Sequence, residues 1–244
     1  NQFIIENGAT ASVAWLKQAT AGFDVGVNQS NSHNQTIIRS GGTLNLTDPG
    51  PDPQAPYGEF AYTSLGSGDF IVDSGTVHSA HYIAAWGSPG VKPGIYLRGG
   101  LLDTKGLGGG YASDTVRVGD GKGQTMELHV NGGDCMFYGG PSGASTQRDP
   151  DDPGQGYYAW GICLAVKSAG ILSGSISNLW SEYPYTNQGF LIEGGIVAPG
   201  DPTTAGTIRV TEGWLGFDAN STLDMDVYSA HVYDRIVHST QTNY

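Results

Sequence analysis

Charged side chains lie close together at three places in this sequence, and such clusters are what enzymes that cleave acidic polysaccharides use. The pairs are Asp69 with Asp73, Asp114 with Arg117, and Arg98 with Asp103. Glycoside hydrolysis needs two carboxyl groups at a defined separation, and no pair stands out by its spacing. The sequence therefore predicts no catalytic residue. A polysaccharide lyase or hydrolase is kept as an alternative function.

Metal-binding side chains are also present, but their spacing does not favour a site. His78 and His81 are three residues apart, and a strand or corner places residues so spaced on different faces. The acidic run of Asp149, Asp151 and Asp152 offers the oxygen ligands that calcium prefers, without the spacing of an EF-hand. The sequence predicts no metal site and no cofactor, and leaves calcium at the acidic run open.

The composition indicates which elements must position these residues. Glycine makes up 39 of 244 residues and charged residues only 14%, against typical values of about 7% and ~25%. Many short strands joined by turns have this composition. A net charge of −12 without a cluster of Lys and Arg excludes nucleic acid as a partner. No apolar run is long enough to span a membrane.

A glycine-punctuated segment recurs along the chain, in which an apolar arm, one polar residue and a Gly-containing corner precede a second arm. The last apolar residues before the corners are Ile5, Ile38, Val72, Leu97, Val130, Val166, Ile192 and Val210. Spacings of 18 to 36 residues are too long for successive hairpins and are typical of the coils of a parallel β-solenoid. We therefore predict one all-β solenoid domain over residues 1–244, with about eight coils.

The residues that directly follow these eight apolar positions should stack into one polar column. Its expected members are Glu6, Arg39, Asp73, Arg98, Asn131, Lys167, Glu193 and Thr211. The first four alternate in charge, and Lys167 and Glu193 are opposite in charge. Neighbouring strands lie about 4.8 Å apart, and opposite charges at that separation stabilise the pairing.

The stretch MELHVNGGDCMF (126–137) tests this interpretation, because Asn-Gly between alternating arms is also a strong hairpin signal. The solenoid makes Asn131-Gly132-Gly133 a corner, whereas a β-sandwich makes it a hairpin. Cys135 and Cys163 form either one disulfide bridge or two buried thiols.

Long inserted loops are predicted where Pro, Gly and Asp gather, at 47–58, 139–156 and 181–189. Aromatic residues near them are Trp86, Trp160, Trp180, Tyr183 and Tyr185. These rings either stack on sugars, as in a carbohydrate-binding adhesin, or cover coil edges.

The second half resembles the passenger-domain repeats of autotransporters and related bacterial surface proteins. The segments that carry this resemblance are VRVGDGKGQTMELHVNGG, FLIEGGIVAPGDPTTAGTIRV, and STLDMDV followed by YDRIV. The resemblance extends over Val116 to Val237 and implies a right-handed parallel β-helix with a structural role. The chain departs from the family by lacking its C-terminal membrane barrel and by stopping soon after YDRIV.

The ends of a solenoid present unpaired strand edges that natural proteins usually cap, and neither end of this sequence carries a capping pattern. We therefore expect Phe3 and Ile5 of one copy to meet Ile236 and Val237 of the next. Such a head-to-tail contact produces a homopolymer. A chain that begins at Asn1 without a signal peptide fits a mature, secreted product. The expected function is a subunit of an extracellular or cell-surface fibre, with a polysaccharide as the alternative partner.

Overall fold

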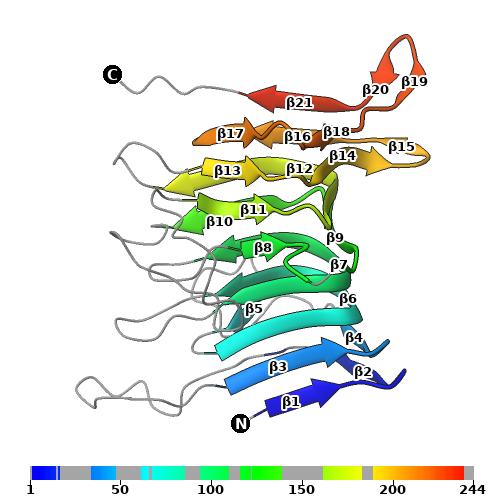
Figure 1. The fold of residues 1–244 in the computed structure, drawn as a ribbon, viewed down its shortest axis with the longest axis vertical. Helices are drawn as coiled ribbons and strands as arrows, with labels where there is room; N and C mark the ends of the chain where they lie inside the picture. The colour runs from blue at the N-terminus through cyan, green and yellow to red at the C-terminus, as the bar shows by residue number, and fades with distance from the viewer. Residues whose placement is uncertain are drawn as a thin grey trace.

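The computed structural model describes residues 2–14, 16, 34–47, 62–65, 68–85, 94–109, 116–121, 123–138, 162–182 and 189–238. These residues form an all-β structure in which nineteen strands belong to one sheet. The strands form successive layers that follow the chain from β1 near the N-terminus to β21 near the C-terminus (Figure 1). Almost every pairing is parallel and joins segments distant in sequence. Two short antiparallel pairs are the exceptions in the described chain.

The strands fall into three stacks, which we number by the order in which the chain visits them. The first stack comprises β1 (Gln2–Ile5), β3 (Asn34–Arg39), the first parts of β6 (Gly68–Ala85) and β7 (Ile95–Gly109), β8 (Val116–Val118), β11 (Ile162–Val166), β13 (Gly189–Ile192) and β17 (Trp214–Phe217).

The second stack follows one corner later. It comprises β2 (Thr10–Val13), β4 (Thr43–Leu46), the middle parts of β6 and β7, β9 (Met126–Asn131), the first part of β12 (Gly170–Glu182), β14 (Ile196–Asp201) and β18 (Thr222–Leu223).

The third stack comprises β5 (Tyr62–Leu65), the ends of β6 and β7, β10 (Asp134–Tyr138), the end of β12, β16 (Thr207–Val210) and β21 (Arg235–His238). Two additions lie near the C-terminal end. β15 (Thr204–Ala205) pairs with β14, and β19 (Val227–Ser229) pairs with β20 (Val232–Tyr233).

The core lies between the stacks and consists of columns of apolar side chains, in which each residue packs on the one at the same position in the next layer. In the first stack one column runs through Ile5, Ile38, Val72, Leu97, Val118, Val166, Ile192 and Phe217. In the second stack one column runs through Ala11, Leu44, Val77, Leu102, Leu128, Leu172, Val197 and Leu223. Burying each such Leu or Ile stabilises the fold by about 1.5–3 kcal/mol.

Corners form where the chain contains glycine or another residue that tolerates positive φ. Gly100, at the corner of the long strand β7, has φ of 101° and lies opposite Gly75 of β6. A Cβ atom on Gly100 would lie 1.9 Å from the carbonyl oxygen of Gly75. The two layers can approach this closely only because neither position carries a side chain.

The two arms of MELHVNGGDCMF form β9 and β10. β9 and β10 do not pair with each other, and each pairs in parallel with β7 and β12. Gly132 has φ of 73°, which allows the chain to turn from the second stack into the third. The hairpin alternative is therefore wrong.

The eightfold alignment of the sequence is wrong at two positions. Val130 lies in the second stack, opposite Thr104 and Gly174, and Val210 lies in the third, opposite Leu179 and His238. Val118 and Phe217 occupy the expected places in the first stack. The apolar–polar–Gly pattern marks corners of more than one kind, so the pattern alone does not identify the stack.

Candidate functional site

A row of polar side chains lies on the outer face of the second stack. The strand registers place in one line Ser12, Asn45, His78, Asp103, His129 and Ser173. Each occupies the outward position next to a buried column residue, because side chains alternate along a strand. Glu127 and Asn131 lie on β9 beside His129, two residues away in either direction.

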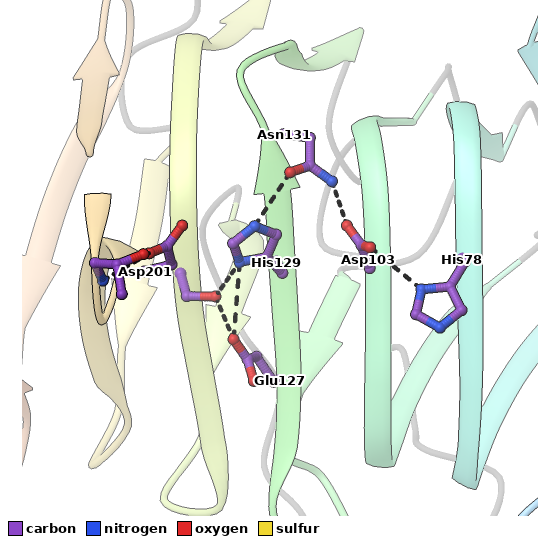
Figure 2. Close-up of polar contacts among 8 residues, drawn as sticks. His78, Asp103, Glu127, His129, Asn131 and Asp201 are labelled. Carbon is purple, nitrogen blue, oxygen red and sulfur yellow. Dashed lines mark hydrogen bonds and ion pairs between the residues drawn. The ribbon is translucent and has the colours of Figure 1, made fainter. Parts of the chain in front are cut away.

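Short polar contacts join six of these side chains into one connected group, which we call the polar array, and Figure 2 labels five of its members, His78, Asp103, Glu127, His129 and Asn131. The polar array consists of His78, Asp103, Glu127, His129, Asn131 and Ser173. Asp103 links two of its neighbours, since its Oδ2 lies 3.2 Å from Nδ1 of His78 and its Oδ1 accepts a hydrogen bond from Nδ2 of Asn131. The Oδ1 atom of Asn131 lies 3.2 Å from Nε2 of His129.

The other end of the polar array is built around the Ser173 hydroxyl. It donates a hydrogen bond of 2.6 Å to Oε1 of Glu127 and lies 2.9 Å from Nδ1 of His129. Because a serine hydroxyl carries one proton, a hydroxyl that donates to Glu127 accepts from His129. A serine nucleophile instead donates its proton to histidine. This geometry therefore makes Ser173 a link between neighbouring layers.

The predicted polar column of the first stack is brought together in part. The Nε atom of Arg39 lies 2.6 Å from Oε2 of Glu6, and Nζ of Lys167 lies 2.7 Å from Oε2 of Glu193. Asp73 lies opposite Arg39 in the register. Arg39 and Glu6 are exposed, so their ion pair contributes about 1 kcal/mol or less.

Three predicted members lie elsewhere. A register shift after Val72 places Gly99 opposite Asp73, and Arg98 lies over the ring of Tyr96, 5.6 Å from its centroid. Asn131 belongs to the second stack and lies opposite Ser175. Thr211, the eighth position of that column, follows Val210 in the third stack and lies outside the first stack.

Asp218 follows Phe217 and so takes the last place of the first-stack column, next to Glu193. Its Oδ1 accepts hydrogen bonds of 2.7 Å from the Ser221 hydroxyl and 2.9 Å from the Gly194 amide. The hydroxyl of Ser221, followed by the backbone amides, lowers the pKa of Asp218. This carboxylate therefore stays charged beside another carboxylate because local donors stabilise it.

Large exposed apolar side chains gather at the two end layers. In the described residues they are Phe3, Ile4, Phe217, Leu223, Met225, Val227, Tyr228, Val232 and Tyr233. Phe3, on β1, is 44% exposed, while Ile5 on the same strand is 4% exposed and begins a core column. Ile236 and Val237 are half-buried on β21 at the opposite end. Apolar side chains that one more layer of strands would cover are thus exposed to solvent at both ends of the stack.

The candidate catalytic pairs are not assembled into a site. Asp69 is buried and accepts a hydrogen bond of 3.3 Å from the Gly94 amide. Arg117 pairs with Asp120 at 3.6 Å, while Asp114 lies outside the described residues. The Arg98 side chain lies over Tyr96, and Asp103 belongs to the polar array.

The two closely spaced histidines lie in different environments, since His78 is exposed and His81 is 2% exposed. Nε2 of His81 lies 2.7 Å from the Thr47 carbonyl oxygen. In the described part of the chain, no three His, Cys, Asp or Glu side chains are grouped to hold a metal ion. The acidic run at 149–152 lies outside the described residues, as do Trp86, Trp160, Tyr183 and Tyr185.

Cys135 and Cys163 are free and buried, so the disulfide alternative is wrong. Burial raises the pKa of Cys135 to about 12 and that of Cys163 to about 11. The thiolate is the reactive form. We therefore expect no reaction with Ellman's reagent at pH 8 in the native protein, and two thiols per chain after unfolding in urea. Rapid native reaction of either thiol would contradict this burial.

Comparison with protein-family models, curated proteins and solved structures finds no match to this chain. Among the described residues no helix is both long enough and apolar enough to cross a bilayer.

Proposed function

We propose that the three stacks are the sides of a right-handed parallel β-helix of about eight coils, and that the protein is a secreted structural protein of an extracellular or cell-surface fibre. Copies would assemble head to tail, with the last layer of one on the first layer of the next. The parallel registers and the resemblance to bacterial surface repeats support the coil arrangement. Right-handed connection is the rule for parallel strands.

The observation that carries this proposal is the way the two longest core columns end. The first-stack column runs from Ile5 to Phe217, and the second-stack column runs from Ala11 to Leu223. Phe217 and Leu223 are 43% and 49% exposed. If the same register continued into a second copy, Phe217 would cover Ile5 and Leu223 would cover Ala11. Ile236 and Val237, which the sequence led us to place against Phe3 and Ile5, lie on β21 in the third stack, so the contact proposed here uses Phe217 and Leu223 in their place. The joint would then extend both columns without interruption.

Backbone groups support the same contact. In the described chain β1 pairs only with β3, and β17, β18 and β21 each pair with one earlier strand. The outer edge of each end strand therefore leaves amide and carbonyl groups free to pair, and such edges readily take on another chain. A contact between two different surfaces does not close on itself, so repetition gives a filament.

The proposed joint also brings like charges together, which predicts a dependence on salt. Asp218 follows Phe217 and Glu6 follows Ile5, so the two carboxylates would become neighbours in the joint. The Debye length is about 3 Å at 1 M salt and ~30 Å at 0.01 M. We expect filaments at the higher ionic strength and few at the lower, measured by light scattering and negative-stain electron microscopy.

Glu6→Gln is the matched variant, because it removes one of the two like charges and leaves the apolar contact intact. It should assemble at lower salt than the unaltered protein. A protein that stays monomeric at high concentration and in both salts would overturn the proposal.

A further inference from the structure

A groove lies on the outer side of the third stack, away from the polar array and from the core columns. It has a volume of about 270 Å³ and crosses three successive strands, β12, β16 and β21. Six of its lining residues point to its chemistry, namely Ser175, Ser177, Thr207, Arg209, Arg235 and Val237. Three hydroxyls and two guanidinium groups thus line one hollow.

An irregularity in the register helps to form this hollow. Ile176 pairs with Ile208, but the next pair is Leu179 with Val210, so β12 carries one more residue than β16 over this span. A bulge of this kind bends the strand and redirects side chains, and bulges are common next to binding sites. Ser177 lies within the bulge, and its hydroxyl donates to the Gly132 carbonyl oxygen at 2.6 Å. Small hydroxyl residues therefore lie beside long arginines.

The two arginines give the groove a charge opposite to that of the protein. The chain has a net charge of −12, yet in the described part no carboxylate forms an ion pair or hydrogen bond with Arg209 or Arg235. Asp234, next to Arg235 in sequence, is turned inward. Its two oxygens accept hydrogen bonds of 2.8 Å from the Gly206 amide and 2.9 Å from the Asp226 amide.

An aromatic ring adjoins these cations. The guanidinium carbon of Arg235 lies 5.3 Å from the centroid of the Tyr233 ring, and Tyr233 is among the exposed side chains. Stacking on a ring holds the planar guanidinium in place while leaving its N–H groups available to an acceptor.

We propose that this groove binds the carboxylate groups of an acidic glycan. Arginine binds carboxylates through paired N–H donors, and the two arginines lie diagonally on neighbouring strands, with Arg209 opposite Val237 and Arg235 opposite Thr207. The serine and threonine hydroxyls supply hydrogen bonds suited to sugar hydroxyls. The groove crosses three strands and is open to solvent, which fits an extended chain better than a single small anion.

This site goes beyond end-to-end assembly and does not depend on it, because its arginines lie on the outward face of the stack while the proposed joint uses strand edges and inward columns. The test measures binding of an oligogalacturonate to the full chain by isothermal titration calorimetry. Free galacturonate, an oligoglutamate and a neutral malto-oligosaccharide of matching length are the comparison ligands.

The variant Arg209→Gln/Arg235→Gln removes both guanidinium groups and changes the net charge from −12 to −14. The control Arg39→Gln/Lys105→Gln makes the same change in net charge at exposed positions outside the groove. We expect affinity for oligogalacturonate to fall by about tenfold or more in the first variant and by less than about twofold in the control. Circular dichroism should show that both variants keep the fold.

Three outcomes would overturn the proposal. Equal losses in the two variants would show attraction by net charge alone. Equal affinity for free galacturonate or for oligoglutamate would contradict the assignment of the ligand as a glycan chain. Absence of oligogalacturonate binding would contradict the proposed site itself. Because variants that block assembly should still bind, failure of this proposal can be told apart from failure of the fibre.

Discussion

End-to-end assembly is expected to disappear when Phe217 and Leu223 are both replaced with aspartate. Each side chain ends a continuous core column, and each remains nearly half exposed. Fully burying a Phe or Leu side chain contributes about 1.5–3 kcal/mol, and the joint would bury only the half of each that is still exposed, so losing both removes roughly 1.5–3 kcal/mol from the joint. This corresponds to an increase of about 10- to 100-fold in the critical concentration for assembly.

The substitutions strengthen the effect through charge repulsion, since position 217 adjoins Asp218 and position 223 adjoins Asp224. Pelleting over a concentration series, followed by electron microscopy, measures the critical concentration. The matched control is Val227→Asp/Val232→Asp, which places two charges on the β19–β20 hairpin in the same end layer. Val227 is 76% exposed and lies outside both columns. The control should assemble like the unaltered protein, and equal losses in both variants would argue against the register of the joint.

The second large effect is expected from Gly100→Ala, which should destabilise the fold by about 2–5 kcal/mol. A Cβ atom at this position would lie 1.9 Å from the Gly75 carbonyl oxygen in the neighbouring layer. Backbone atoms cannot move aside as a flexible side chain can, and overpacking of this kind costs about 1–3 kcal/mol. The φ angle of 101° adds strain of about 1–2 kcal/mol for a residue with a Cβ atom.

Gly132→Ala separates these two contributions. Gly132 has a similar positive φ, and a Cβ atom there would meet nothing within 4 Å. Its replacement should cost only the backbone strain of about 1–2 kcal/mol. Urea unfolding followed by circular dichroism measures both variants. Equal losses would show that the layers can separate at Gly100 without cost, contrary to the packing described above.

The fold class was predictable because parallel stacking imposes a strong local pattern on the sequence. The Asn131-Gly132-Gly133 corner, the parallel pairing and the all-β composition all follow from that pattern. The identity of each corner was not predictable from it. Asn131 follows a second-stack strand and Lys167 a first-stack strand, yet both stand between an apolar arm and a glycine-containing turn. Only the strand partners, which are distant in sequence, distinguish them.

The polar array illustrates a signal that the sequence contained and that the corner alignment missed. His78 lies six residues after Val72, and Asp103 lies six residues after Leu97. Val72 and Leu97 are neighbours in the first stack, so residues that follow them by the same distance are expected to lie side by side on neighbouring strands. This reasoning would have placed His78 next to Asp103. His129 breaks the rule, because it lies eleven residues after Val118, so an offset of six residues would have missed it even from the correct first-stack position. The longer segment between the first and second stacks in this layer therefore concealed the contact between Asp103 and the β9 residues.

The three stacks have a mechanical consequence. Each layer is joined to the next by main-chain hydrogen bonds from up to three strands, directed along the length of the stack. Tension applied along that direction would load all the bonds of one boundary together, so rupture would require their simultaneous loss.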